Sequence, residues 1–233
     1  MSHIDSRFFK IISHRGYCLS DIKPNSFEAF KMALNSNFGI EVDIRDSLEE
    51  LKVSHDPATH DSLSLDTLLS FYRDIQSNLC ISFNIKADGL QPLLLQKLSE
   101  YSISNYFTFD MSVPNTVQDC NAGLKFFLRQ SEFETILLNK PNSLYKKCAG
   151  IYIDQFSFSS DVLEYNLNSI TTHINNDKKI CWVSPELHSW GKENNYRQTV
   201  WNKLKEIFKS IIVNHEIYLL TDYPKEAEKI FYA

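Results

Sequence analysis

The chain has 233 residues, of which 43% are hydrophobic and 23% charged, the balance of an ordinary globular protein. Its formal net charge is −5 and no block of five or more like charges occurs, so we expect no nucleic-acid partner. The polar start has no signal-peptide core, and no apolar run approaches the roughly 20 residues of a membrane-spanning helix. With five cysteines and no CxxC pair, these features predict a cytoplasmic protein without stable membrane association.

Short β-rich runs alternate along the chain with segments of helical spacing. The predicted strands are Phe8–Ser13, Gly39–Arg45, Leu79–Lys86, Tyr106–Asp110, Lys125–Leu128, Gly150–Asp154, Lys179–Ser184 and Glu216–Thr221. The predicted helices are Ser26–Ser36, Ser64–Ile75, Gln91–Tyr101, Val113–Ala122, Asn142–Lys147, Ser159–Asn175, Tyr196–Ser210 and Lys225–Tyr232. Capping residues support several helix starts, among them Asn25 or Ser26 for the first helix and Ser64 for the second.

Eight strand–helix units in a chain of this length predict an α/β fold, a (β/α)8 TIM barrel that forms a single domain over residues 1–233. A doubly wound open sheet is the alternative. Such a sheet would normally carry a glycine-rich phosphate turn after its first strand. The six glycines of this chain form neither GxGxxG nor GxxxxGK[ST], which favours the barrel.

The predicted strands are apolar in the middle and polar at their C-terminal ends. The ends read "SHRG" in the first strand, "EVD" in the second, "NIK" in the third, "SPELH" in the seventh and "TD" in the eighth. In a barrel, the C-terminal ends of all strands meet on one face, where active sites are built. The sequence therefore predicts a polar site assembled from several strands.

Glu41 and Asp43 are two residues apart in a strand, so both carboxylates point to the same face. Two such charges repel each other unless a positive charge lies between them. A hard divalent cation accepts oxygen ligands from such a pair and keeps positions open for water and substrate. The alternative is that the two acids form structural ion pairs with Arg15, Arg45 or Lys86.

His14, Arg15 and Gly16 follow the first strand, and the planar guanidinium fork of Arg15 matches phosphate oxygens. The stretch "IRDSLEELKVSHD" predicts a hairpin that folds His55 back over the strand-two carboxylates. Two histidines facing each other would form an acid–base pair. The alternative for His14 is a histidine that bonds to the backbone at a strand end.

The order and spacing of "SHRG", "NSFEAFKMA", "GIEVDI", "VSHDP" and "FNIK" resemble the glycerophosphodiester phosphodiesterase family over the first third of the chain. The resemblance implies a phosphodiester hydrolase with a divalent cation. It implies that His14 and His55 are the general acid and base, and that Arg15 and Lys86 contact phosphate. It also implies that Glu41, Asp43 and position 84 hold the cation, expected to be magnesium or calcium.

Three departures from the family pattern bear on the site. The third metal-binding acid of the family is Asn84 here, which leaves two negative charges instead of three and predicts weaker cation binding. The family's P-E-N-T reads "KPNS", and its Asp-Gly hairpin turn reads Leu48-Glu49-Glu50, a change we expect to be harmless. Glu186, just past the seventh strand, is a candidate to restore a carboxylate or to bind substrate, with a solvent-exposed loop residue as the alternative.

Together these features predict cleavage of a small glycerophosphodiester-like molecule to an alcohol and a phosphomonoester, an activity of lipid metabolism. A second hypothesis is a non-catalytic barrel that binds a phosphorylated ligand, since one acid is lost. The two histidines argue against it, because binding alone does not require both. A third, an unrelated barrel enzyme such as an isomerase or aldolase, would not require Arg15 and Lys86 beside two histidines. The sequence does not predict an oligomeric state.

Overall fold

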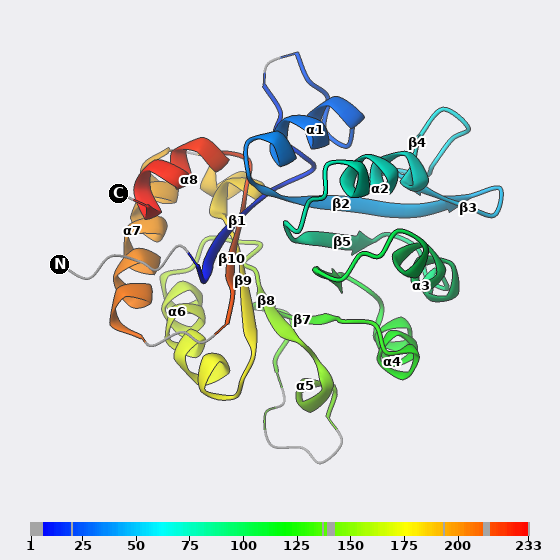
Figure 1. The fold of residues 1–233 in the computed structure, drawn as a ribbon. Helices are drawn as coiled ribbons and strands as arrows, with labels where there is room; N and C mark the ends of the chain where they lie inside the picture. Colours follow the sequence, from blue (N-terminus) through cyan, green and yellow to red (C-terminus); the bar gives the residue numbers. More distant parts are fainter. Residues whose placement is uncertain are drawn as a thin grey trace. The chain divides into compact units, whose positions relative to one another are not determined.

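The computed structural model describes residues 7–19, 21–136, 138, 143–192, 194–211 and 215–232. Its contacts form two compact units (Figure 1). We call Ile12–Phe127 the N-terminal unit, and Met1–Ile11 with Leu128–Ala233 the C-terminal unit. The boundaries fall inside strands β1 (Phe9–Ser13) and β7 (Phe127–Gln130). Within the described ranges, no helix has both the length and the apolar character needed to cross a membrane.

The N-terminal unit is built on parallel strands. β2 (Gly39–Ser47) pairs in parallel with the end of β1 and with β5 (Ile81–Ile85), and β5 pairs in parallel with β6 (Tyr106–Phe109). β2 also continues into an antiparallel hairpin with β3 (Glu50–Val53), which pairs with β4 (Leu63–Ser64). The helices of this unit are α1 (Phe27–Asn35), α2 (Leu65–Asp74), α3 (Gln91–Glu100) and α4 (Val113–Ala122).

The register of these strands brings polar residues together at their C-terminal ends. Asp43 of β2 lies opposite Asn84 of β5, and Asn84 lies opposite Phe109 of β6. Lys86 directly follows β5, and its backbone N–H donates to the carbonyl of Ile44. Paired residues in adjacent strands point to the same face of a sheet. The side chains of Asp43 and Asn84 therefore lie on one face, and Lys86 follows at the same end of these strands.

The C-terminal unit has the same alternating organisation. β8 (Gly150–Ile153), β9 (Lys179–Val183) and β10 (Ile217–Thr221) pair in parallel, and β7 lies beside β8. The α-helices are α5 (Leu144–Lys147), α6 (Ser160–Asn175), α7 (Asn194–Ser210) and α8 (Pro224–Phe231). Two 3-10 turns, η1 (Pro185–Leu187) and η2 (Ser189–Gly191), follow β9.

Each predicted strand and helix corresponds to an element of the structure, which confirms a mixed α/β fold with parallel strands. The fifth unit differs most: its strand lies at Phe127–Gln130, two residues after the predicted position. The helix predicted from Asn142 begins at Leu144, and Asn142 itself lies outside the described residues. Ser26 caps α1 as predicted, whereas the Ser64 side chain forms no capping bond at α2. The barrel and the single domain stay predictions.

The predicted hairpin forms between β2 and β3, with Ser47 paired to Glu50. The two residues between them, Leu48 and Glu49, have positive φ angles of 52° and 64°. A two-residue turn of this kind favours asparagine and glycine, because other side chains enter the left-handed region at a cost of about 1–2 kcal/mol each. The turn therefore forms without glycine, at that cost in stability.

A buried histidine of the C-terminal unit predicts a pH-dependent stability. His173 in α6 is 2% exposed, and its two ring nitrogens contact Tyr145 Oη at 3.0 Å and Gln130 Oε1 at 2.9 Å. Burial lowers the pKa of His173 from 6.5 to about 4. Between these values the unfolded chain binds a proton that the folded chain does not. We therefore expect this residue to reduce the free energy of unfolding as the pH falls from 6.5 to 4, by up to about 3 kcal/mol.

Urea unfolding of the H173Q variant between pH 7 and pH 4 measures this contribution. The variant should lose less stability on acidification than the wild type. The matched control is H60Q, because the His60 side chain is 90% exposed and its Asp61 contact lies at the surface. Equal acid slopes for the wild type and H173Q would contradict the prediction.

Candidate active site

The turn after β1 places Arg15 beside the strand-two carboxylates. Arg15 and Gly16 both have positive φ, 53° and 84°. A Cβ atom at Gly16 would lie 2.7 Å from Ala29 in α1, so only glycine fits between the turn and this helix. The resulting path of the backbone directs the Arg15 N–H to Glu41 Oε2, at 3.0 Å. The "HRG" segment is thus bound to strand β2 through its backbone as well as its side chain.

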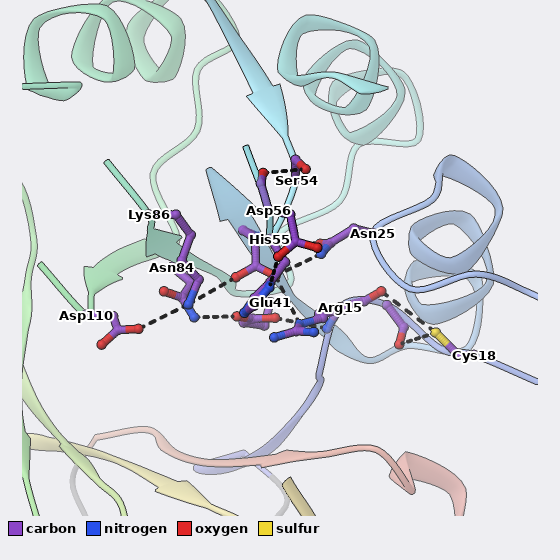
Figure 2. Close-up of polar contacts among 12 residues, drawn as sticks. Arg15, Cys18, Asn25, Glu41, Ser54, His55, Asp56, Asn84, Lys86 and Asp110 are labelled. Atoms are coloured by element: carbon purple, nitrogen blue, oxygen red, sulfur yellow. Dashed lines mark hydrogen bonds and ion pairs between the residues drawn. The ribbon is translucent and has the colours of Figure 1, made fainter. Parts of the chain in front are cut away.

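Asp43 is fully buried and surrounded by positive and polar groups. Its Oδ2 contacts Arg15 Nε at 3.0 Å and accepts a hydrogen bond of 2.8 Å from Asn25 Nδ2 (Figure 2). Its Oδ1 lies 3.5 Å from Lys86 Nζ. The ion pairs considered from the sequence therefore form with Arg15 and Lys86. Arg45 instead donates from Nε to the carbonyl oxygen of His55.

Glu41 is also fully buried, and both of its oxygens accept hydrogen bonds. Asn84 Nδ2 donates to Oε1 at 3.0 Å, and the Arg15 N–H donates to Oε2. Burial, and then repulsion by Asp43, raise the pKa of Glu41 above 4.5. His14, the Asn84 hydrogen bond and Arg15 act in the opposite direction. Burial and the neighbouring carboxylate therefore outweigh these three groups in setting the pKa of Glu41.

Two buried oxygen atoms at this location accept no hydrogen bond: Asp43 Oδ1 and Asn84 Oδ1. A buried polar atom without such a partner is costly, and a bound cation would remove that cost. Within the described ranges, no three His, Cys, Asp or Glu residues gather as a metal site. The residues that could hold a cation at this location are the carboxylates of Glu41 and Asp43 and the amide oxygen of Asn84, and oxygen donors of this kind suit a hard divalent ion.

His55 follows the hairpin that the sequence predicts. The N–H of Ser54 donates to the carbonyl of Asp43, which ties the end of β3 to β2. The His55 side chain is 47% exposed, and its Nδ1 lies 3.0 Å from Asp56 Oδ1. His55, Arg15 and Asn25 line one cavity of roughly 530 Å³. The facing arrangement of His14 and His55 stays a prediction.

Two residues of this site were not among the predicted functional residues. Asn25, predicted as a helix start and as part of the "NSFEAFKMA" motif, binds Asp43, and Asp110 accepts a hydrogen bond of 3.2 Å from Lys86 Nζ. Both have positive φ, 58° and 70°, a conformation that Asn and Asp tolerate better than most residues. For Asp110 the available signal was its position at the C-terminal end of the predicted strand Tyr106–Asp110. Asn25 begins the "NSFEAFKMA" motif, but its contact with Asp43 depends on the path of the loop before α1, which the motif does not predict.

Glu186 belongs to the C-terminal unit and is buried. Its carboxylate accepts hydrogen bonds from Ser184 Oγ, from Thr221 Oγ1 at 2.5 Å and from the Asp222 N–H at 3.2 Å. Burial raises its pKa. The alternative of a solvent-exposed loop glutamate is therefore wrong. Its role as a substrate or metal ligand stays a prediction. Its neighbour His188 binds Asp154 Oδ1 at 2.7 Å.

No family model matches the chain, and no curated protein matches it in sequence. Solved structures with a similar fold include a protein assigned as a glycerophosphodiester phosphodiesterase from Galdieria sulphuraria, 14% identical, with a TM-score of 0.69 over 98% of this chain and 100% of that one. A glycerophosphodiester phosphodiesterase from Agrobacterium tumefaciens is 15% identical, with a TM-score of 0.61 over 96% and 99%. A dihydropteroate synthetase is 7% identical, with a TM-score of 0.58 over 97% and 93%. At these identities the likeness shows the fold.

Proposed function

We propose that the chain is a phosphodiesterase with a (β/α)8 barrel that hydrolyses a small glycerophosphodiester-like molecule to an alcohol and a phosphomonoester. The observation that carries the proposal is the convergence of two cationic side chains, Arg15 and Lys86, on the buried carboxylate of Asp43. This cluster lies beside Glu41 and next to a cavity that His55 lines. The likeness in fold to two glycerophosphodiester phosphodiesterases supports the same reaction class.

Glu41, Asp43 Oδ1 and Asn84 Oδ1 are the proposed ligands of a divalent cation, magnesium or calcium. The two buried oxygens without a hydrogen bond and the raised pKa of Glu41 support this assignment. When bound, the cation would neutralise negative charge on the phosphate oxygens, which stabilises the transition state of phosphoryl transfer. With a neutral amide as the third ligand, we expect weaker affinity than a set of three carboxylates would give.

The chain's own residues bind and orient the diester. The Arg15 guanidinium presents parallel N–H donors to two phosphate oxygens, and the Lys86 ammonium adds a second positive charge. Asp56 accepts a hydrogen bond from His55 Nδ1, which leaves Nε2 as the proton acceptor of the neutral ring. His55 and His14 act as the proposed acid–base pair: one removes the proton of the nucleophile, which is water or a neighbouring hydroxyl of the substrate, and the other protonates the departing alcohol.

A barrel that binds a phosphorylated ligand without cleaving it is the second candidate. The absence of a three-residue His, Cys, Asp or Glu cluster, as far as the described residues extend, is the observation that favours it. The retained histidines and the half-exposed His55 favour the enzyme. The two candidates differ in one outcome, which is turnover that depends on a divalent cation.

We expect the protein to hydrolyse bis(p-nitrophenyl) phosphate only when Mg²⁺, Ca²⁺ or Mn²⁺ is present. Removal of the ion with EDTA should abolish turnover, because the positive charge that stabilises the transition state at the phosphate would be too small without it. Re-addition of the ion should restore turnover. A spectrophotometric assay across a metal titration measures this. Saturable phosphate binding with no turnover under any of the three ions would identify the binding module instead.

A further inference from the structure

Lys86 lies between two carboxylates of the N-terminal unit. Its Nζ donates a hydrogen bond to Asp110 Oδ2 at 3.2 Å and lies 3.5 Å from Asp43 Oδ1, without a hydrogen bond to that oxygen (Figure 2). The shorter and directional contact is therefore the one to Asp110, which comes from the end of β6. The ammonium is therefore hydrogen-bonded to Asp110 and forms only a longer ion pair with Asp43.

The position of Lys86 matters because Asp43 Oδ1 is one of the oxygens proposed above as ligands of the cation. The other oxygen, Oδ2, already accepts from Asn25 and contacts Arg15. Oδ1 is buried and has no hydrogen bond. An ammonium that moved from 3.5 Å to hydrogen-bond distance would satisfy this oxygen itself and compete with a divalent ion for it.

The charges of the cluster lead to the same conclusion. Glu41, Asp43 and Asp110 carry three negative charges, and Arg15 and Lys86 carry two positive charges, so the five side chains leave one net negative charge. A divalent cation reverses the sign to one net positive charge, which a phosphodiester monoanion neutralises. Without Asp110 the cluster would be neutral before the cation binds. Lys86 would then pair with Asp43, the same carboxylate that the cation is proposed to bind.

The backbone of Asp110 has a conformation that few residue types adopt. Its φ angle is 70°, in the left-handed region, which aspartate and asparagine enter more easily than most residues. Arg15 and Asn25 on the other side of Asp43 share this conformation. Backbone strain of this kind persists where the surroundings hold a side chain in a required direction.

We propose that Asp110 is a positioning residue that holds the Lys86 ammonium off Asp43 Oδ1 and so keeps this oxygen available to the divalent cation. The inference rests on the cation site proposed above. Asp110 contacts neither the cation nor the substrate in this role. It acts through Lys86, which remains directed to the phosphate.

The test is a double-mutant cycle read by calorimetric titration with Mn²⁺ alone, without substrate. The variants are D110N, K86M and D110N/K86M, and D110N retains the tolerance of positive φ while it removes the charge. We expect D110N to weaken Mn²⁺ binding about tenfold in the wild-type background. In the K86M background the same change should alter the dissociation constant less than about twofold, because the competing ammonium is absent.

The matched control is D74N, which also removes one negative charge from this unit, at the end of α2. The Asp74 side chain is 65% exposed and pairs with Arg73. D74N should leave Mn²⁺ affinity unchanged. An equal loss of affinity on D110N in both backgrounds would overturn the inference, because Asp110 would then act on the cation directly. Binding by D110N as tight as that of the wild type would also overturn it. If the wild type itself shows no saturable Mn²⁺ binding, the proposed cation site fails, and the inference fails with it.

Discussion

Replacing His14 or His55 with alanine is expected to abolish measurable turnover of bis(p-nitrophenyl) phosphate while the fold remains intact. Each histidine is proposed to move one proton in the reaction, and loss of such a group costs about 10²–10⁴-fold in rate. His55 is half-exposed, so its removal leaves no buried cavity. Steady-state kinetics with circular dichroism and a melting curve for each variant measures both parts of the prediction.

His60 offers a close control within the same loop region. Like His55, it precedes an aspartate, and its Nδ1 lies 3.2 Å from Asp61 Oδ1. Its side chain is 90% exposed and it has no proposed part in the reaction. H60A should retain wild-type rates. Near-normal rates for both H14A and H55A would show that the assigned roles are wrong.

Changing the charge at two neighbouring positions is expected to have opposite effects on cation binding. D43N removes a proposed ligand charge and should lower kcat/KM at least about 10²-fold, because Arg15, Lys86 and the cation all depend on this carboxylate. N84D adds the third carboxylate that the family pattern has, and should tighten Mn²⁺ binding about tenfold. The two side chains lie opposite each other in β2 and β5, so the site is the same in both variants.

Melting temperatures measured with EDTA and with Mn²⁺ distinguish an effect of each variant on cation binding from a loss of fold stability. Without metal, N84D should melt lower than the wild type, because its new carboxylate would face Glu41 where Asn84 now donates a hydrogen bond. Added Mn²⁺ should raise its melting temperature more than that of the wild type. D43N should change little with Mn²⁺. A larger Mn²⁺ shift for D43N than for N84D would contradict the proposed ligand set.

Local sequence patterns predicted the strands and helices because the spacing of apolar residues follows the repeat of the backbone, about 2 residues in a strand and about 3.6 in a helix. Alternation in "GIEVDI" identifies β2 and requires Glu41 and Asp43 to share a face, whatever lies around them. The hairpin of β2 and β3 followed from two short strand patterns separated by a polar turn. The fifth unit was predicted least well: its strand begins at Phe127, whereas Phe126 before it pairs with Thr108 in an isolated bridge.

The chemical composition of the candidate site could also be predicted, because parallel strands place their C-terminal ends on one edge. That argument places Arg15, Asp43 and Lys86 near one another, and their contacts confirm the proximity. It does not predict which oxygen each cation meets. The hydrogen bond of Asn25 to Asp43 depends on a loop backbone with positive φ, which the pattern of residue types does not determine.

By itself the sequence determined the α/β character of the chain and the residue types at the ends of its strands, since both depend on periodicity and local preference. Only the tertiary structure decided how the charges are paired. Asp110 holds Lys86, Asn84 donates its amide to Glu41, and Asp43 Oδ1 is left without a hydrogen bond. These contacts join segments up to 43 residues apart in sequence. Their geometry is set by strand register and by the burial of carboxylates, which no local pattern encodes.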